Sequence, residues 1–83
     1  MKRNVKVTVT VEVEVDETKF TPEFMEEFRG YMYKFNSVEE HMSHLAEQRA
    51  IGQWSGFIEG YGPPEEMGIK TMIIEYETEI VDV

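Results

Sequence analysis

The sequence predicts an α+β fold, with a three-stranded, mainly antiparallel sheet and two helices packed on one face, in the order β-α-α-β-β. Three observations support this prediction. Segments near both ends of the chain alternate apolar and polar residues, two segments between them begin with helix-start signals, and an aromatic stretch follows the second helix. The other face of the sheet is expected to stay open to water or to a partner.

The first strand is expected over residues 2–16. Valine occupies every odd position from Val5 to Val15, and every even position between them is polar. A helix would scatter these valines around its axis, whereas a strand places all of them on one face. The opposite face carries a lower half of Lys6, Thr8 and Thr10 and an upper half of Glu12, Glu14 and Asp16.

The first helix is expected from Pro22 to about Lys34. Thr21 is a suitable N-cap, and proline is tolerated at the first helical position because an N–H there would have no partner within the helix. An apolar stripe follows at helical spacing and is expected to face the core. Its members are Phe24, Phe28, Tyr31 or Met32, and Phe35.

The second helix is expected to begin at Val38. Ser37 and Glu40 have the spacing of a capping box, in which the two side chains satisfy free backbone N–H groups at the start of the helix. Gly52 is a suitable residue to end it. The break before Ser37 is short, so the two helices form either a hairpin or one kinked rod.

Residues 53–62 are expected to contain a short strand, and the glycine- and proline-rich residues 60–68 a long turn or loop. Trp54 and Phe57 are expected to close the end of the core, because large aromatic side chains are mostly buried. Tyr61 and the proline loop after it are expected to be exposed and available to a partner.

The last strand is expected within residues 68–83, where the alternation returns. Antiparallel pairing with the first strand, in a register whose residue numbers sum to 85, places Lys6 opposite Glu79 and Thr8 opposite Glu77. No two acids then meet, whereas several parallel registers stack acid on acid at a cost of up to about 1 kcal/mol per pair. The antiparallel register is therefore favoured.

The first strand has a second pairing option, which is its own copy. Antiparallel pairing about Thr10 brings Lys6 opposite Glu14 and Thr8 opposite Glu12. A long regular strand at a sheet edge promotes association unless something covers it. The alternative interpretation is that Lys6 and the acids keep this edge unpaired.

The charge balance narrows the class of partner. Seventeen acidic and eight basic residues give a net charge of −9, which repels phosphates, so direct binding to nucleic acid is not expected. The acids either meet a basic surface or keep a small domain soluble. One domain, residues 1–83, is expected, without a secretory signal or membrane span and located in the cytoplasm. The chain contains no cysteine, which excludes disulfides and thiolate metal sites.

One cluster of titratable groups resembles a metal site. His41 and His44 share a helix face, and Glu40 and Glu47 flank them. A metal site needs three or four protein ligands, and neither the His-Glu-x-x-His spacing nor a third ligand is evident. Surface histidines paired locally with glutamate are the favoured interpretation, so no cofactor and no metal are expected. No catalytic residue is expected either, because the serines lack a recognisable base and oxyanion loop.

The strings TPEFMEEFR and FIEGYGPPEEMGI resemble small uncharacterised proteins encoded by phages and bacterial mobile elements. The profile of a short, acidic, cysteine-free α+β chain without enzyme signatures is similar to that of anti-CRISPR and other anti-defence proteins. This resemblance covers size, element order and the two strings, and it transfers no catalytic residue. It implies a protein that acts in the cytoplasm of a bacterial host cell and occludes a nucleic-acid-binding surface of a host complex.

The sequence therefore favours a non-enzymatic inhibitor whose acidic residues occupy a basic surface of a host protein or nucleoprotein complex. The expected partner-binding residues are Glu12, Glu14, Glu75, Glu77, Glu79, Tyr61, Glu65 and Glu66. One alternative is a homodimeric structural or assembly module joined through residues 5–15. The other is a small metal-binding protein or metal-dependent enzyme that uses His41 and His44.

Overall fold

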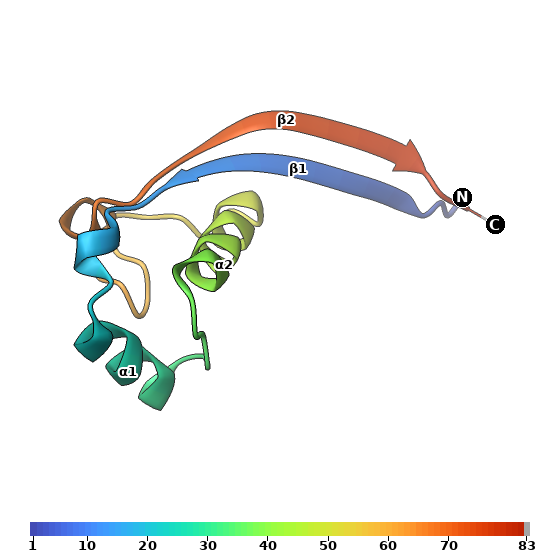
Figure 1. Ribbon diagram of the computed structural model, residues 1–83. Helices are drawn as coiled ribbons and strands as arrows, with labels where there is room; N and C mark the ends of the chain where they lie inside the picture. Colours follow the sequence, from blue (N-terminus) through green and yellow to red (C-terminus); the bar gives the residue numbers. More distant parts are fainter. Residues whose placement is uncertain (83) are drawn as a thin grey trace.

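A long antiparallel ribbon, made of β1 (Val5–Glu14) and β2 (Lys70–Ile80), extends from a small helical body in the computed structural model, which describes residues 1–82 (Figure 1). The molecule measures 50 × 23 × 19 Å, and its radius of gyration is 15.3 Å. A compact chain of this length would have a radius of gyration of about 12 Å. The difference reflects the ribbon, whose far end lies well beyond the body.

The body contains two α-helices, α1 (Pro22–Tyr31) and α2 (Val38–Ala50), and the short 3-10 helices η1 (Glu17–Lys19) and η2 (Pro64–Met67). It lies beneath the end of the ribbon where the strands join it, and both termini lie at the opposite end (Figure 1). Helix α2 contacts both strands.

The chain is α+β, but the prediction of a three-stranded sheet is wrong. Within residues 1–82 the sheet contains two strands, and residues 53–62 supply an isolated bridge between Ile58 and Gly62 in place of a third. The backbone N–H of each of these residues donates to the carbonyl of the other at 2.9 Å. The loop thus closes on itself, because Gly60 and Gly62 adopt φ of +92° and +77°, which turn the chain back.

The antiparallel register predicted for the strands is confirmed over most of the ribbon. Residue numbers sum to 85 from the pair Val5–Ile80 to the pair Thr10–Glu75. The next pair is Val11–Ile73, so Ile74 is an extra residue on β2 and forms a β-bulge. Beyond the bulge the register moves by one residue, and Val83, at the end of the predicted last strand, lies outside the described residues.

Both predicted helix starts are confirmed. The Phe24 N–H donates to Thr21 Oγ1 at 3.1 Å, and the Glu40 N–H donates to Ser37 Oγ at 3.2 Å. Helix α1 ends at Tyr31, before the expected Lys34.

The early end of α1 has a packing reason. The chain turns after this helix so that the Phe35 ring stacks on Phe28, with 5.7 Å between ring centroids. Arg29 Nη1 also donates to the Phe35 carbonyl at 3.3 Å. The two helices are therefore separate elements joined by residues 32–37, and the kinked-rod alternative is wrong.

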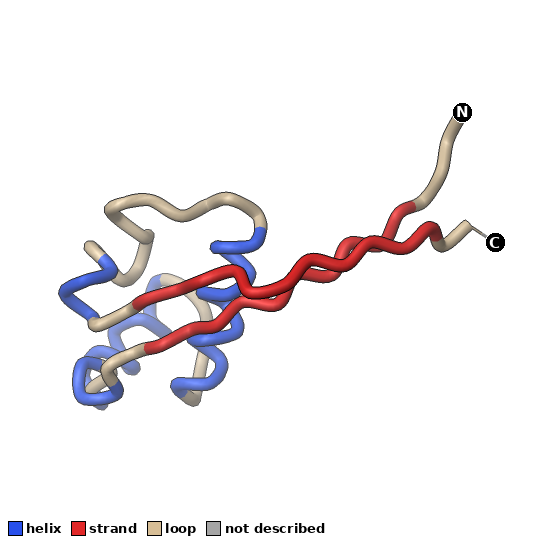
Figure 2. Tube along the Cα trace, turned by 90° about the horizontal axis from the view of Figure 1, so that it is seen from above, coloured by secondary structure: helices blue, strands red, loops and turns tan. Residues whose placement is uncertain are grey.

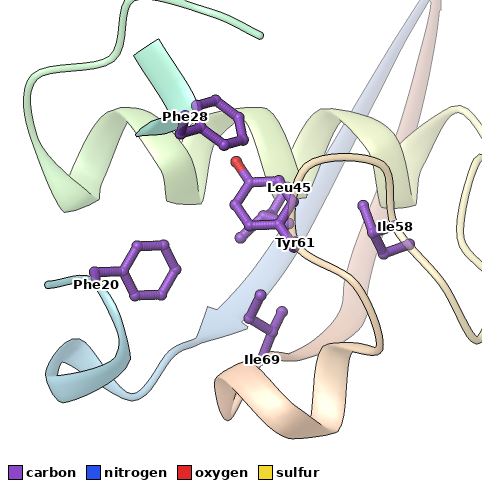
Figure 3. Close-up of a cluster of buried hydrophobic side chains, with 6 residues drawn as sticks. All are labelled: Phe20, Phe28, Leu45, Ile58, Tyr61 and Ile69. Atoms are coloured by element: carbon purple, nitrogen blue, oxygen red, sulfur yellow. The ribbon is translucent and has the colours of Figure 1, made fainter. Parts of the chain in front are cut away.

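The core lies within the body and beneath the near half of the ribbon. Its buried apolar residues are Phe20, Phe28, Leu45, Ile58, Tyr61 and Ile69 (Figure 3). Val13 and Val15 pack against this core, whereas Val5 and Val7 are 52% and 58% exposed. The helices therefore cover only part of the valine face, in contrast to the expected sheet covered along one whole face.

Replacing Leu45 by alanine tests this position of the core. Leu45 is fully buried, so Leu45→Ala should lower the free energy of unfolding by about 2–5 kcal/mol. Phe57→Ala is the control, because Phe57 is 65% exposed and its loss should change stability by about 0.5 kcal/mol or less. Urea unfolding followed by circular dichroism measures both, and equal losses would contradict the placement of the core.

Candidate functional site

The polar side of the ribbon carries a set of exposed glutamates that we call the acidic face: Glu12, Glu14, Glu75, Glu77 and Glu79. Side chains of directly opposed residues share a face of a ribbon, and successive residues alternate between faces. The valines of β1 point toward the body, since Val13 packs against the core, so the acidic face points away from it. No element of residues 1–82 covers it (Figure 1).

Cross-strand pairing divides the acidic face into paired and unpaired charges. Lys6 lies opposite Glu79 and Lys70 lies opposite Glu14. The other three glutamates lie opposite uncharged residues: Glu75 opposite Thr10, Glu77 opposite Thr8 and Glu12 opposite Met72. Among residues 1–82 the one ion pair is Arg3–Asp82 at 3.5 Å, near the free end of the ribbon. The carboxylates in the middle of the face are therefore free to meet cations from another molecule.

Tyr61 does not belong to this surface, so the expectation that it is an exposed anchor is wrong. It is 6% exposed, and its hydroxyl oxygen lies 2.7 Å from His41 Nδ1. The turn at Gly60 directs the Tyr61 ring into the body, 5.1 Å from the ring centroid of Phe28 (Figure 3). A partner cannot reach this side chain without opening the core.

Glu65 and Glu66 are exposed as expected, on η2 immediately before β2. Pro64 beside them is buried, so the expectation that the proline loop is exposed is wrong at this position, and Pro64 anchors the short helix in the body. The two glutamates therefore lie at the end of the ribbon that joins the body, and the aromatic anchor expected beside them is buried.

The aromatic residues of the 53–59 stretch behave differently from one another. Trp54 is half-buried against the core, as expected. Phe57 is mostly exposed, which contradicts its expected role in closing the core. Both line an open cavity of about 630 Å³, which also includes Tyr33 and His44. Ser55 Oγ donates to the Phe57 carbonyl at 2.7 Å, which fixes the local turn.

His41 is completely buried, although a surface position was expected for it. Four phenylalanine rings surround it at centroid distances between 4.6 and 5.8 Å; they belong to Phe20, Phe24, Phe28 and Phe35. The sequence held a signal for this position: His41 lies between Val38 and Leu45 on the inward stripe of α2.

Burial also sets the protonation of the pair formed by His41 and Tyr61. It lowers the pKa of His41 to about 4, with a smaller contribution from the nearby His44, because a charged imidazole loses its hydration there. Burial raises the pKa of Tyr61 for the same reason. His41 is therefore neutral near pH 7. Its Nε2 has no hydrogen-bond partner among residues 1–82.

The histidines do not assemble a metal centre. No group of three or more metal-ligating side chains occurs in the described part of the chain. His41 Nδ1 is hydrogen-bonded to the Tyr61 hydroxyl group, and the Glu40 carboxylate accepts a hydrogen bond from the Asn36 N–H at 3.1 Å. The expected pairing of Glu40 with a histidine is thus replaced by a capping role.

Comparison with known proteins finds no family model, curated protein or solved structure that matches this chain. Among residues 1–82, neither α-helix has the length and apolar character needed to cross a membrane.

Stability should fall in mild acid because of His41. An unfolded histidine takes up a proton near pH 6.5, whereas folded His41 resists protonation down to about pH 4. Protonation of His41 therefore does not lower the free energy of unfolding above pH 6.5. Between pH 6.5 and 4 it lowers this free energy by about 3 kcal/mol at most. Denaturant unfolding at several pH values measures it.

His41→Gln keeps a hydrogen-bonding group toward Tyr61 but does not titrate, so its stability should fall less steeply over that range. His44→Gln is the comparison variant: burial lowers the pKa of His44 as well, although this side chain is only half-buried. An unchanged slope in His41→Gln would show that this histidine does not contribute to the acid sensitivity.

Proposed function

We propose that this protein is a non-enzymatic inhibitor whose acidic face occupies a basic, nucleic-acid-binding surface of a host complex, as anti-defence proteins do. The observation that carries the proposal is the position of five exposed glutamates on one uncovered face of the ribbon. Five carboxylates share this face with two ammonium groups, those of Lys6 and Lys70, so the face itself is negative.

The spacing of the acids supports imitation of a polyanion. Glu75, Glu77 and Glu79 recur at every second residue of β2, which is about 7 Å along the strand. One strand of duplex DNA carries a phosphate about every 3.4 Å along the helix axis. The row thus presents carboxylates at a regular spacing along one direction, so arginines or lysines arranged for a nucleic acid meet several carboxylates in a row.

The ribbon offers this row to a partner without rearrangement. Its glutamates stand on a paired strand, so little conformational entropy is lost on binding. Complementary charge accelerates encounter and excludes the competing nucleic acid from the same surface. Two of the groups considered for catalysis are engaged elsewhere: Ser37 caps α2, and His41 is enclosed by aromatic rings.

Neutralising the row should weaken inhibition. The test first isolates a partner from host lysate on immobilised wild-type protein and then measures displacement of a labelled oligonucleotide from that partner by fluorescence anisotropy. The triple variant Glu75→Gln, Glu77→Gln, Glu79→Gln should lose about 10- to 100-fold in potency, at roughly 0.5–1 kcal/mol per charge pair.

The matched control is the triple variant Glu23→Gln, Glu26→Gln, Glu27→Gln on α1, which changes the net charge equally at exposed positions. It should keep potency within about threefold, because contributions from distant charges are screened. Equal losses in the two variants would assign the effect to net charge alone. Full potency of the ribbon variant would remove the acidic face from the mechanism.

A further inference from the structure

The ribbon leaves an unusual amount of surface exposed. The accessible surface is 6169 Å², whereas a compact protein of 9.7 kDa has about 5,100 Å². Part of the excess is apolar and lies on the far half of the valine face, where Val5, Val7, Tyr76 and Ile80 are all more than half exposed. The excess of roughly 1,000 Å² is similar to the area of about 800 Å² that one partner loses in an interface of standard size.

The two strands differ in how well their unpaired edges can accept another strand. Within residues 1–82 the sheet contains only β1 and β2, so each has one open edge. The edge of β2 is interrupted by the bulge at Ile74, a device that discourages strand addition. The edge of β1 is regular from Val5 to Glu14.

Backbone direction shows which groups β1 presents at its open edge. The Val81 N–H donates to the Asn4 carbonyl at 2.8 Å, so Asn4 directs its backbone groups toward the second strand. Alternation along an antiparallel ladder means that Lys6, Thr8 and Thr10 do the same. The valines at odd positions therefore direct their N–H and C=O groups outward, available to a new strand.

We propose that two copies of this chain pair antiparallel through the open edges of β1, about a two-fold axis at Thr10. The product is a four-stranded sheet in the order β2-β1-β1-β2. This inference does not depend on the proposed function. It rests on the free backbone groups, on the exposed apolar surface and on charge complementarity.

Charge complementarity favours pairing through β1 over pairing through β2. Lys6 lies opposite the partner's Glu14, and Thr8 lies opposite the partner's Glu12, so no like charges meet. These are the non-hydrogen-bonded positions, at which opposed side chains approach most closely. Self-pairing through β2 about Glu77 would instead place Glu77 against its own copy and Glu75 against the partner's Glu79. The strand with the bulge is therefore also the strand whose charges oppose pairing.

The two-fold axis is perpendicular to the sheet, so both bodies lie on the same face at opposite ends. Val7 then neighbours the partner's Val13, which packs against that copy's core. The body extends to both sides of its own ribbon when seen from above, so it can cover valines of a neighbouring strand (Figure 2). The exposed half of each valine face is thereby placed over the other body, and the two acidic faces form one surface.

A proline substitution in either strand, at one cross-strand pair, tests which of the two open edges forms the interface. Val7 and Thr78 lie opposite each other, and each directs its N–H to its own open edge. Light scattering after size-exclusion chromatography at about 100 μM should give roughly 19 kDa for the wild type, twice the mass of one chain. Val7→Pro should give the monomer mass, and Thr78→Pro should keep the dimer mass.

A monomeric wild type over the whole concentration range would overturn the proposal. A dimer lost in Thr78→Pro but kept in Val7→Pro would also overturn it, because the interface would then be β2. Circular dichroism and unfolding at low concentration show whether each proline variant is folded.

A mixing experiment tests the register and does not need proline. Lys6→Glu alone and Glu14→Lys alone each place like charges across the interface, so both dimers should be weaker and should dissociate at higher concentration than the wild type does. An equimolar mixture restores opposite charges at both positions and should dimerise at least about tenfold more tightly than either variant, or roughly 1.4 kcal/mol. An equimolar mixture that dimerises no more tightly than either variant alone would contradict the pairing about Thr10.

Discussion

The body depends on the contacts of one side chain, Phe28. Its ring is 1% exposed and packs against five other rings, those of Phe24, Tyr31, Phe35, His41 and Tyr61. These rings come from α1, from the connection after it, from α2 and from the loop after α2, so a single ring joins four segments. The loop approaches so closely that a Cβ on Gly60 would lie 2.6 Å from the Phe28 ring. Glycine is thus required there by space as well as by its φ of +92°.

The ribbon is stabilised differently from the body. Only its near half lies against the core, and its far half depends on cross-strand hydrogen bonds and side-chain pairs, which make a two-stranded hairpin marginally stable at best. Asp82 strengthens the far end, because its carboxylate accepts a hydrogen bond from the Asn4 N–H at 2.7 Å and lies near Arg3. The chain thus combines a packed centre with a projecting element whose stability is local.

The parts of this fold that depend on local chemistry were predictable from the sequence. The valine alternation identified β1, the residues Thr21 and Ser37 marked the helix starts, and avoidance of like charges gave the strand register. The predictions that are wrong concern which surfaces are covered by other parts of the chain. A period of two shows which residues share a face, but it does not show whether anything packs on that face, so exposure of Val5 and Val7 was missed.

The candidate site was predictable to the same extent. The acidic face follows directly from alternation and register, and its five glutamates are exposed together. Tyr61 and Phe57 were assigned to the wrong environments because the turn at Gly60 and Gly62 decides which aromatic ring points inward. Sequence spacing alone does not fix the backbone angles of such glycines. Burial of His41 was not predicted, because a polar side chain favours a surface position even though this residue lies on the inward stripe of α2.

The extra residue at Ile74 decides which residues in the near half of β2 face the body. In an unbroken register Met72 would face the body, and Ile73 would lie among the acids. With the bulge, Ile73 lies opposite Val11 on the body side, while Glu75, Glu77 and Glu79 remain on the other. One extra residue therefore shifts the alternation of inward- and outward-facing side chains between the half of β2 near the body and the half that carries the three glutamates.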